Sequence, residues 1–537
     1  MAPPGYRELV RSYLDLRWQL DPVSATMSGV GEYDGRLGHF GRADVKAVVA
    51  ALKAMGFAFE AAQTDTLADE VDQTAVLNEI RHTVARYEKE KPHELNPEFH
   101  LSHLLSGLFS LLVRQDQPRE ARGRAIAGRL REVPRFLADA QQALGRPPAV
   151  FTETALDVAE GGRTLLGEAV PEFAKSLPRD VSEEIAAALV DARTAYDAFA
   201  DFVAGPLMNR SDGAFAVGRD AFDFRLHFEH ALIETAPEIL RYGEALVRET
   251  EAELTAIAAE LAPGVPWREL ADRLRTLHPP GDTVVPAYAG QMERARRFVL
   301  QRALATVPVG DLEVIATPSF MTPLVPFAAY DPPGAFSADR TGWFYVTEVK
   351  GGGKRDHCTH EIACTALHEG WPGHHLQFLA AQAQESPVRR VVSSPLTVEG
   401  WALYCEELMA ELGFLTRPEE RFFQRLHLLW RAARIVLDVR LHTAGMGVQE
   451  AVRFLTDTLG IGRASAEAEV RRYCGNPAYQ LCYAVGRREF LRLRDAYRAR
   501  AGAGFSLRAF HDEALSYGGL PVSLIRWGMG LPDEPRR

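Results

Sequence analysis

The sequence predicts a large, mainly α-helical protein with one small β-sheet, folded as a single domain over residues 1–537. Two patterns and the composition lead to this prediction. Apolar residues recur at three- and four-residue steps over long stretches, which is typical of amphipathic helices. Residues that favour strands gather mainly between about 311 and 350. Hydrophobic residues make up 47% of the chain and charged residues 25%, which indicates a substantial buried core.

Residues 1 to about 215 are expected to form a helical N-terminal lobe. Val71, Leu77 and Ile80 follow helical spacing with charged residues between them. An apolar stripe of this kind usually packs into a core. Proline-containing breaks at 145–148 and 177–178 predict loops between helices.

The section 216–350 is expected to combine helices with the sheet. Thr235 predicts a helix start, because Glu238 lies three residues later and reaches back to the amide of the cap. This helix should run to about residues 263–264. His227 and His230 precede it at a spacing found in metal sites, but no third ligand lies near them, which favours a structural role.

Two segments in this section predict strands, Leu312–Ala316 and Trp343–Thr347, because both are rich in β-formers and bounded by proline or glycine. An exposed strand edge can hold an extended peptide by main-chain hydrogen bonds. The alternative is a small stabilising sheet without substrate contact. The run Gly351–Lys354 predicts a mobile segment or a close backbone approach, and it lacks the pattern of a phosphate-binding loop.

Charge and cysteine content exclude some classes of protein. The formal net charge of -11 leaves no basic surplus to neutralise nucleic-acid phosphates. The five cysteines are odd in number and irregularly spaced, which suits a reducing compartment rather than a disulfide framework. We see neither a signal peptide nor an apolar stretch of about 18 residues. We therefore expect a cytoplasmic protein without nucleic-acid or membrane partners.

The section 351–416 should carry the functional site. His368 is followed directly by Glu369, with His374 and His375 shortly after and Glu399 further on. Imidazole and carboxylate ligands hold catalytic zinc and leave one position open for water. A glutamate beside a ligand histidine is the general base of metallopeptidases. The pattern predicts a zinc hydrolase of the zincin kind with one Zn²⁺ per chain.

The spacing of the histidines departs from the usual helical motif, in which two histidines four residues apart face the same way. The position four after His368 is Pro372. On an ideal helix His374 would lie about 9 Å along and about 120° around the axis, and His375 about 10.5 Å along. Because Zn–N bonds are only about 2.1 Å long, neither histidine at such a position could share a zinc ion with His368. Pro372 and Gly373 interrupt a helix, however, and would let His374 fold back beside His368.

Glu399 is the expected third ligand, at the start of a helix that runs through Leu412. Glu406 lies seven residues on, on the same face, and would orient a ligand histidine. The alternative for Glu399 is an N-terminal charge that the helix dipole favours. A rival metal cluster of four residues lies upstream at helical spacing, although a helix with one buried face gives the same pattern; its members are His357, His360, Cys364 and His368.

The strings 368–377 and 399–404 resemble the two signatures of the bacterial DUF885 family, whose members are large, mainly helical proteins similar to zincin metallopeptidases. The resemblance covers nearly the whole chain and includes Tyr483 and His442. It implies a zincin-like fold, for which we expect two lobes around a central cleft and the sheet next to the metal-binding helix. It favours His374 over His375 as ligand, although His375 stays an alternative. A departure at Ala444–Gly447 weakens any transfer of substrate class.

In this reading Glu369 accepts the proton of the attacking water and passes it to the leaving amine. Tyr483 is the residue that the resemblance favours as a donor to the oxyanion, with His442 and Arg434 as further candidates. The alternative for Tyr483 is a core tyrosine with a satisfied hydroxyl. A clamp for a terminal carboxylate would need an arginine, and Arg434, Arg440 and Arg487 are all available.

Two other functions share this ligand set. A non-haem iron oxygenase also uses two histidines and one carboxylate, and a non-catalytic binding protein could keep the metal for structure. The substrate is expected to be a peptide or another small amide. The C-terminal part, about 417–527, returns to helices. Endo- or exo-action and oligomeric state are not determined by the sequence.

Overall fold

The computed structural model describes residues 5–280, 283–318, 325, 327–347 and 357–532. The segment Gly351–Lys354, singled out above, lies outside these residues. The protein is mainly helical with one small sheet, as the sequence predicts. Its backbone contacts divide it into two compact units, each described by itself below. Unit 1 comprises Met1–Val217, Pro318–Leu324 and Gly334–Asp339, and unit 2 comprises Gly218–Thr317, Val325–Pro333 and Arg340–Arg537.

Unit 1 is built from helices. Its α-helices are α1 (Tyr6–Leu20), α2 (Pro22–Met27), α3 (Arg42–Ala61), α4 (Leu67–Ala85), α5 (Pro92–Leu95), α6 (Pro97–Val113), α7 (Arg119–Ala143), α8 (Ala149–Thr164), α9 (Val170–Ala174) and α10 (Arg179–Phe202). Short 3₁₀ or π turns continue or connect them: η1 (Gly31–Tyr33), η2 (Arg86–Glu90), η3 (Leu165–Ala169), η4 (Val203–Leu207) and η5 (Met208–Arg210).

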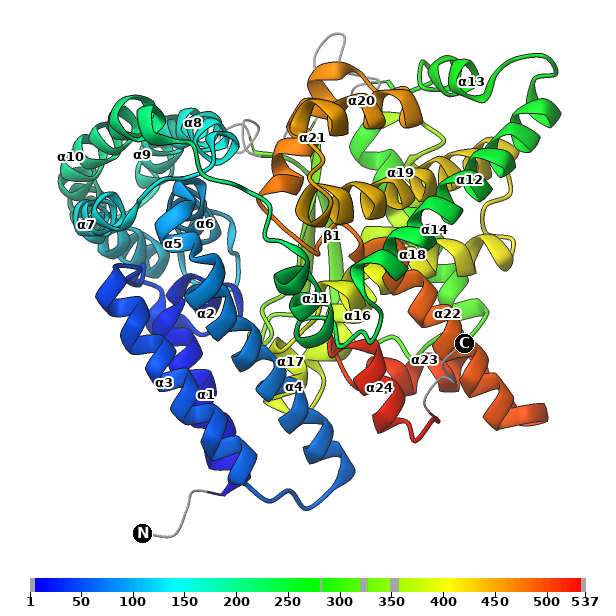
Figure 1. Ribbon diagram of the computed structural model, residues 1–537, viewed down its shortest axis with the longest axis horizontal. Coiled ribbons are helices and arrows are strands. Elements are labelled where there is room, and N and C mark those ends of the chain that lie inside the picture. The colour runs from blue at the N-terminus through cyan, green and yellow to red at the C-terminus, as the bar shows by residue number, and fades with distance from the viewer. Residues whose placement is uncertain (1–4, 281–282, 319–324, 326, 348–356, 533–537) are drawn as a thin grey trace. The chain divides into compact units, whose positions relative to one another are not determined.

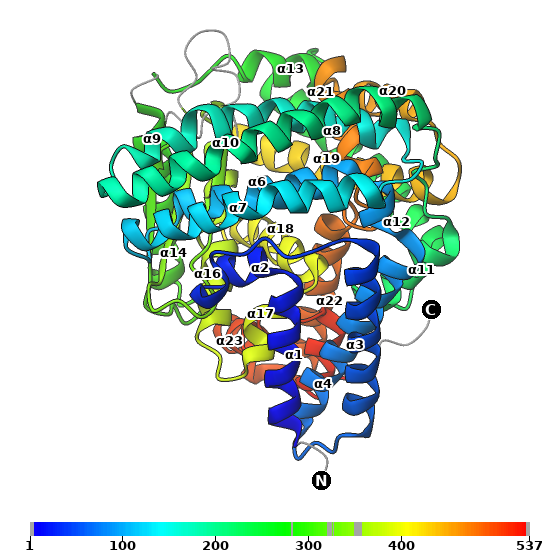
Figure 2. The same ribbon diagram turned by 90° about the vertical axis from the view of Figure 1, so that its left-hand side faces the viewer.

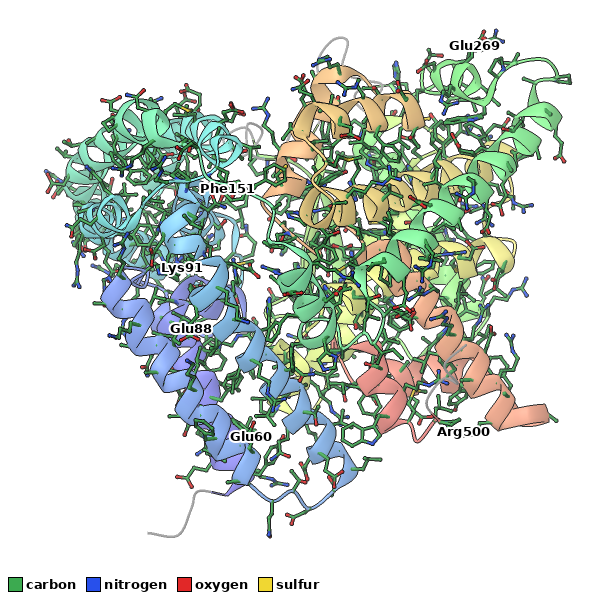
Figure 3. The ribbon with its side chains drawn as sticks, in the orientation of Figure 1. Glu60, Glu88, Lys91, Phe151, Glu269 and Arg500 are labelled. Atoms are coloured by element: carbon green, nitrogen blue, oxygen red, sulfur yellow. The ribbon has the colours of Figure 1, made fainter. Side chains whose placement is uncertain are left out.

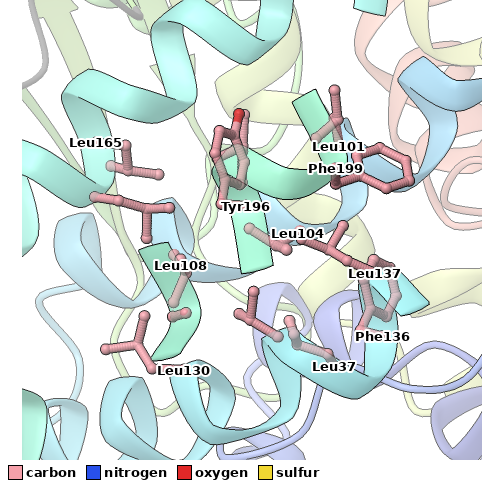
Figure 4. Packing of buried hydrophobic residues seen from close by; sticks show 14 of the residues in the cluster. Leu37, Leu101, Leu104, Leu108, Leu130, Phe136, Leu137, Leu165, Tyr196 and Phe199 are labelled. Atoms are coloured by element: carbon pink, nitrogen blue, oxygen red, sulfur yellow. The ribbon is translucent and has the colours of Figure 1, made fainter. Parts of the chain in front are cut away.

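The core of unit 1 lies between α6, α7, α8 and α10, which pack against one another and run across Figure 2 in roughly parallel layers. Leu104 and Leu108 of α6 and Leu137 of α7 are fully or almost fully buried there (Figure 4). The Tyr196 hydroxyl, also in this core, donates to the Ala159 carbonyl at 3.0 Å. The one polar atom of this buried side chain is therefore satisfied.

Helices α1, α3 and α4 form a further group in unit 1, and both ribbon views show α3 and α4 as a long hairpin (Figures 1 and 2). Exposed ion pairs link its helices. Glu60 on α3 pairs with Arg81 on α4 at 2.8 Å, and Glu88 on η2 pairs with Lys53 on α3 at 2.7 Å (Figure 3). These exposed pairs contribute little to stability, because solvent screens them.

Unit 2 contains the sheet and the helices that follow Gly218. Its α-helices are α11 (Arg219–Phe228), α12 (Ala236–Leu261), α13 (Trp267–Leu274), α14 (Val284–Gln301), α15 (Ile362–Thr365), α16 (His374–Gln382), α17 (Pro387–Val391), α18 (Pro395–Glu411), α19 (Pro418–Thr443), α20 (Val448–Leu459), α21 (Arg463–Cys474), α22 (Cys482–Ala501), α23 (Leu507–Leu515) and α24 (Val522–Gly528). The π-turn η8 (Ala366–Gly370) follows α15, and η9 (Gly502–Gly504) follows α22.

The predicted helix start at Thr235 is confirmed. Its side chain and that of Glu238 form a capping box at the start of α12, and the Thr235 amide donates to Glu238 at 2.8 Å. Helix α12 ends at Leu261, two residues before the predicted break. It packs along α19, beside which it runs in Figure 1.

Both predicted strands are present, and a third joins them. The strands are β1 (Asp311–Ala316), β2 (Ala328–Asp331) and β3 (Thr341–Val346), in the order β1-β3-β2. β1 pairs with β3 in parallel, with Asp311 opposite Thr341, and β2 pairs with β3 in antiparallel register. The sheet is therefore mixed, and β2 is an edge strand in the described part of the chain.

Helix α14 covers the sheet and connects it to the segment that carries His368. Tyr288 and Met292 of α14 form one apolar cluster with Phe344 and Val346 of β3 and with Ala366 at the start of η8. All are buried. The sheet therefore lies next to the segment that carries His368 and Glu369, as the sequence predicts.

Helices α18 and α22 pack backbone to backbone at a pair of glycines. A Cβ atom built on Gly400 would lie 2.5 Å from the Cα of Gly486. Only glycine permits this approach. Gly400 follows Glu399 directly and Gly486 lies three residues after Tyr483, so the contact brings these two side chains to one place. Among the described residues, no helix is both apolar and long enough to span a membrane.

Candidate metal centre

The break predicted between His368 and His374 is present. His368 lies in the π-turn η8, the chain turns through residues 371–373, and α16 begins at His374. The Trp371–Pro372 peptide is cis. A Cβ at position 373 would collide with the carbonyl oxygen of His368, so the turn needs glycine there. The Trp401 indole of α18 donates to the Pro372 carbonyl at 2.9 Å and ties the turn to the helix of Glu399.

The fold-back brings His368, His374 and Glu399 together. The Nε2 atoms of the two histidines lie 3.6 Å and 3.5 Å from Glu399 Oε2, and the rings are 4.8 Å apart, edge to face. A tetrahedral ion with bonds of about 2.1 Å keeps its ligand atoms about 3.4 Å apart. The three donors therefore fit one zinc ion. All three side chains are largely buried.

Glu406 orients His368 as expected. The Glu406 carboxylate lies 2.8 Å from His368 Nδ1, so the ring donates there and directs Nε2 towards Glu399. Burial lowers the pKa of His368, but Glu399 and Glu406 outweigh it and raise this pKa to about 9. Burial likewise raises the pKa of Glu399, while His368 and His374 outweigh it and hold that pKa well below its usual range. The carboxylates of Glu399 and Glu406 therefore favour positive charge in the cluster of His368, His374 and Glu399.

A residue that the sequence did not single out completes the environment of Glu399. The Tyr479 hydroxyl donates to Glu399 Oε1 at 2.8 Å and leaves Oε2 towards the histidines. Burial raises the pKa of Tyr479, so the hydroxyl keeps its proton. The segment that carries Tyr479 is fixed by Asp438 of α19, which accepts from the amides of Ala478 and Leu481 at 3.0 Å and 3.2 Å.

A cavity of about 440 Å³ opens beside the cluster. Its other lining residues include Glu369, Tyr330, Phe378, Arg431, Arg434 and Tyr483. Among the residues that the structure describes, no hydrogen bond or ion pair holds the Glu369 carboxylate. The Tyr483 ring stacks on His368 with centroids 6.4 Å apart. Burial and Glu399 raise the pKa of Tyr483 to about 12 although Arg434 opposes them, so this hydroxyl also remains a donor.

The two arginines of the cavity differ in how they are held. Arg434 donates to the Tyr473 hydroxyl at 2.9 Å and to Glu469 at 3.0 Å, so its charge is already paired. Arg431, which the sequence did not single out, donates to the His427 carbonyl at 3.3 Å. Its Nε is buried without a partner among the described residues. Of the two, Arg431 therefore keeps more donor capacity for an anion in the cavity.

His375 points elsewhere. It is fully buried, and the Tyr330 hydroxyl lies 2.9 Å from its Nδ1. Burial lowers the pKa of His375 to about 3, with Arg296 adding to the effect. Of the two neighbouring histidines, it is therefore His374 that lies beside His368 and Glu399.

Three of the candidate residues lie outside the cavity. His442 packs against Phe222, and its Nε2 lies 3.1 Å from the Tyr473 carbonyl oxygen. Arg440 pairs with Glu244 at 2.6 Å and Arg487 with Glu407 at 3.1 Å. None of these three lines the cavity. Each has the residue type that the site requires, but the helical turn that it occupies directs it to another partner.

The rival upstream cluster does not assemble. His357 Nε2 lies 2.9 Å from the Thr347 carbonyl oxygen, and His360 stacks on Phe423 with ring centroids 6.4 Å apart. Helix α15 begins only at Ile362, so these two histidines precede it and do not share its face. The position of Glu399 also differs slightly from the prediction, which put it at the start of a helix. Helix α18 begins at Pro395, so Glu399 lies in its second turn.

The family described as "Bacterial protein of unknown function (DUF885)" matches residues 22–529. The chain belongs to the DUF885 family. No curated protein matches it. Because the match spans nearly the whole chain, the resemblance drawn from the two signatures is confirmed.

Two solved structures share the fold of this DUF885 protein. One is described as a "putative lipoprotein of unknown function" from Shewanella oneidensis, with a TM-score of 0.81, 22% identity, and coverage of 98% of this chain and 100% of that one. The other is described as a "putative lipoprotein" from Colwellia psychrerythraea, with a TM-score of 0.86, 17% identity, and coverage of 98% and 99%. At these identities the likeness concerns the fold alone.

These neighbours contradict the predicted location. We expected a cytoplasmic DUF885 protein, whereas lipoproteins are held at a membrane by attached lipid and are not cytoplasmic. The prediction was wrong because it rested on features that do not report compartment. All five cysteines are buried free thiols, which pack as small apolar residues in any compartment.

Proposed function

We propose that this protein is a zinc-dependent hydrolase of peptide or related amide bonds. The observation that carries the proposal is the convergence of His368, His374 and Glu399 beside an open cavity that Glu369 also lines. The chemistry of this donor set fits zinc. A zinc ion held there would supply a water of lowered pKa and polarise the carbonyl under attack.

The other residues of the cavity have distinct parts in this proposal. Glu369 accepts the proton of the attacking water and returns it to the leaving amine. Its carboxylate is suited to this because no partner among the described residues holds it. The Tyr483 hydroxyl, which keeps its proton, donates to the oxyanion that forms from the carbonyl. Arg431 attracts an anionic group of the substrate, such as a terminal carboxylate.

The sheet supports a peptide as substrate. Tyr330 of β2 and Pro332 just after it line the cavity. Because β2 is an edge strand in the described part of the chain, its outer side could pair with an extended peptide by main-chain hydrogen bonds. Such pairing would hold the scissile bond near the cluster. We also propose that the fold is related to that of the zincin metallopeptidases. The arrangement of two lobes around a central cleft remains a prediction.

The experiment is a screen of peptides and small amides, with free and with blocked C-termini, against the zinc-loaded protein. Glu369→Gln should lower the rate by roughly 10²–10⁴-fold and keep its zinc, because only the proton acceptor is lost. Glu385→Gln, an exposed glutamate near the end of α16, is the matched control and should retain full activity. Full activity of Glu369→Gln would contradict the mechanism.

A further inference from the structure

Behind the first cluster lies a second group of metal-binding side chains. The Cys364 sulfur, a carboxylate oxygen of Glu406 and an imidazole nitrogen of His427 all lie within 4.8 Å of one another. Cys364 comes from α15, Glu406 from α18 and His427 from α19. Cys364 and Glu406 are 1% exposed, and the His427 side chain is 17% exposed. The group is therefore enclosed, with access past the histidine.

An unsatisfied atom indicates that this group holds a ligand. Glu406 Oε1 accepts from His368, but Glu406 Oε2 is buried without a hydrogen-bond partner among the described residues. A buried carboxylate oxygen without a partner is costly, and native proteins rarely leave one. Since Oε1 is taken, Oε2 is the oxygen available to Cys364 and His427.

We propose that Cys364, Glu406 and His427 bind a second divalent metal ion of the zinc type. Thiolate, imidazole and carboxylate together select zinc or a similar transition metal rather than magnesium or calcium. When the ion binds, the Cys364 thiol releases its proton to solvent. The thiolate and the Glu406 carboxylate then carry two negative charges, which the divalent ion neutralises. This inference does not rest on the proposed hydrolase function.

The position of the group suggests what the ion does. Helix α15 leads directly into η8, which carries His368 and Glu369. An ion that ties α15 to α18 and α19 would fix the start of that segment. Glu406 would serve both groups, with one oxygen on His368 Nδ1 and the other on the ion. The second ion is therefore structural and supports the orientation of His368.

Cobalt(II) tests this directly, because a thiolate bound to Co²⁺ gives a near-ultraviolet charge-transfer absorption that histidine and carboxylate ligands do not give. Metal-free protein is loaded with Co²⁺, and its spectrum and metal content are measured. The wild type and His374→Ala should show the thiolate band. Cys364→Ser and His427→Gln should lose the band and one metal ion per chain. Cys474→Ser, which removes another buried cysteine, is the matched control and should keep both.

The two proposals fail in different ways. A wild type without the thiolate band, whose single ion disappears in His374→Ala, would overturn the second site and leave the hydrolase site intact. A band that Cys364→Ser leaves unchanged would also overturn it. Circular dichroism of each variant establishes that it is folded, and His427→Gln tests the site without changing the sulfur.

Discussion

Tyr479→Phe removes one hydroxyl and leaves every expected metal ligand in place. That hydroxyl donates to Glu399 Oε1 at 2.8 Å in a largely buried environment. A hydrogen bond to a charged group is worth about 1.5–3 kcal/mol, and each 1.4 kcal/mol corresponds to about tenfold in affinity. The variant should therefore bind zinc about 10- to 100-fold more weakly, the range found for partners of metal ligands.

The assay is competition for zinc against a chromogenic chelator, with circular dichroism to verify folding. Tyr483→Phe is the matched variant, since Tyr483 lines the cavity beside the cluster and its hydroxyl is assigned to the oxyanion. It should keep the zinc affinity of the wild type and lose turnover. The reasoning is refuted if Tyr479→Phe binds zinc as tightly as the wild type, because Glu399 would then need no partner to act as ligand.

Three further predictions concern the helix packing behind the site, the pH dependence of stability and the specificity for a free C-terminus. Gly400→Ala should destabilise the protein by about 1–3 kcal/mol in chemical denaturation, because its Cβ would lie 2.5 Å from Gly486. Gly290→Ala, on α14 with open space around it, should be neutral or stabilising, and equal effects of the two would contradict the packing argument. Burial raises the pKa of Asp438 from 3.8 to about 7, so the folded state retains a proton that the unfolded chain releases between these values. Stability should accordingly fall as pH rises through this window and level off above it, and Asp438→Asn should remove that slope from the pH series. Arg431→Gln should raise KM about 10-fold or more for peptides with a free C-terminus and leave C-terminally amidated ones unchanged, whereas an equal effect on both would exclude a carboxylate clamp.

The sequence was most informative where local chemistry determines structure. The Pro372–Gly373 pair predicted that the helix breaks after His368, because neither residue suits a helix interior. The capping pair at Thr235 and Glu238 likewise determined a helix start from adjacent residues. Glu406 followed from its seven-residue spacing to Glu399, since both lie on one face of α18.

Residues that reach the site through long-range packing were harder to predict. Tyr479 depends on Asp438, which lies 41 residues earlier and fixes the backbone on either side of Tyr479. The one local signal is that Tyr479 lies four residues before Tyr483, a spacing that places two side chains on the same side of a helical turn. Arg431 resembles Arg434, Arg440 and Arg487 in sequence, and only the packing of α19 distinguishes it.

The most direct test of the account is the zinc content of purified wild type, His374→Ala and His375→Gln by elemental analysis. His374→Ala should hold one zinc ion fewer per chain than the wild type. His375→Gln, which changes the neighbouring buried histidine bonded to Tyr330, should hold as much as the wild type. Equal zinc in the wild type and His374→Ala, or no zinc in folded wild type after zinc is added back, would contradict the account. Iron in place of zinc would instead favour an oxygenase.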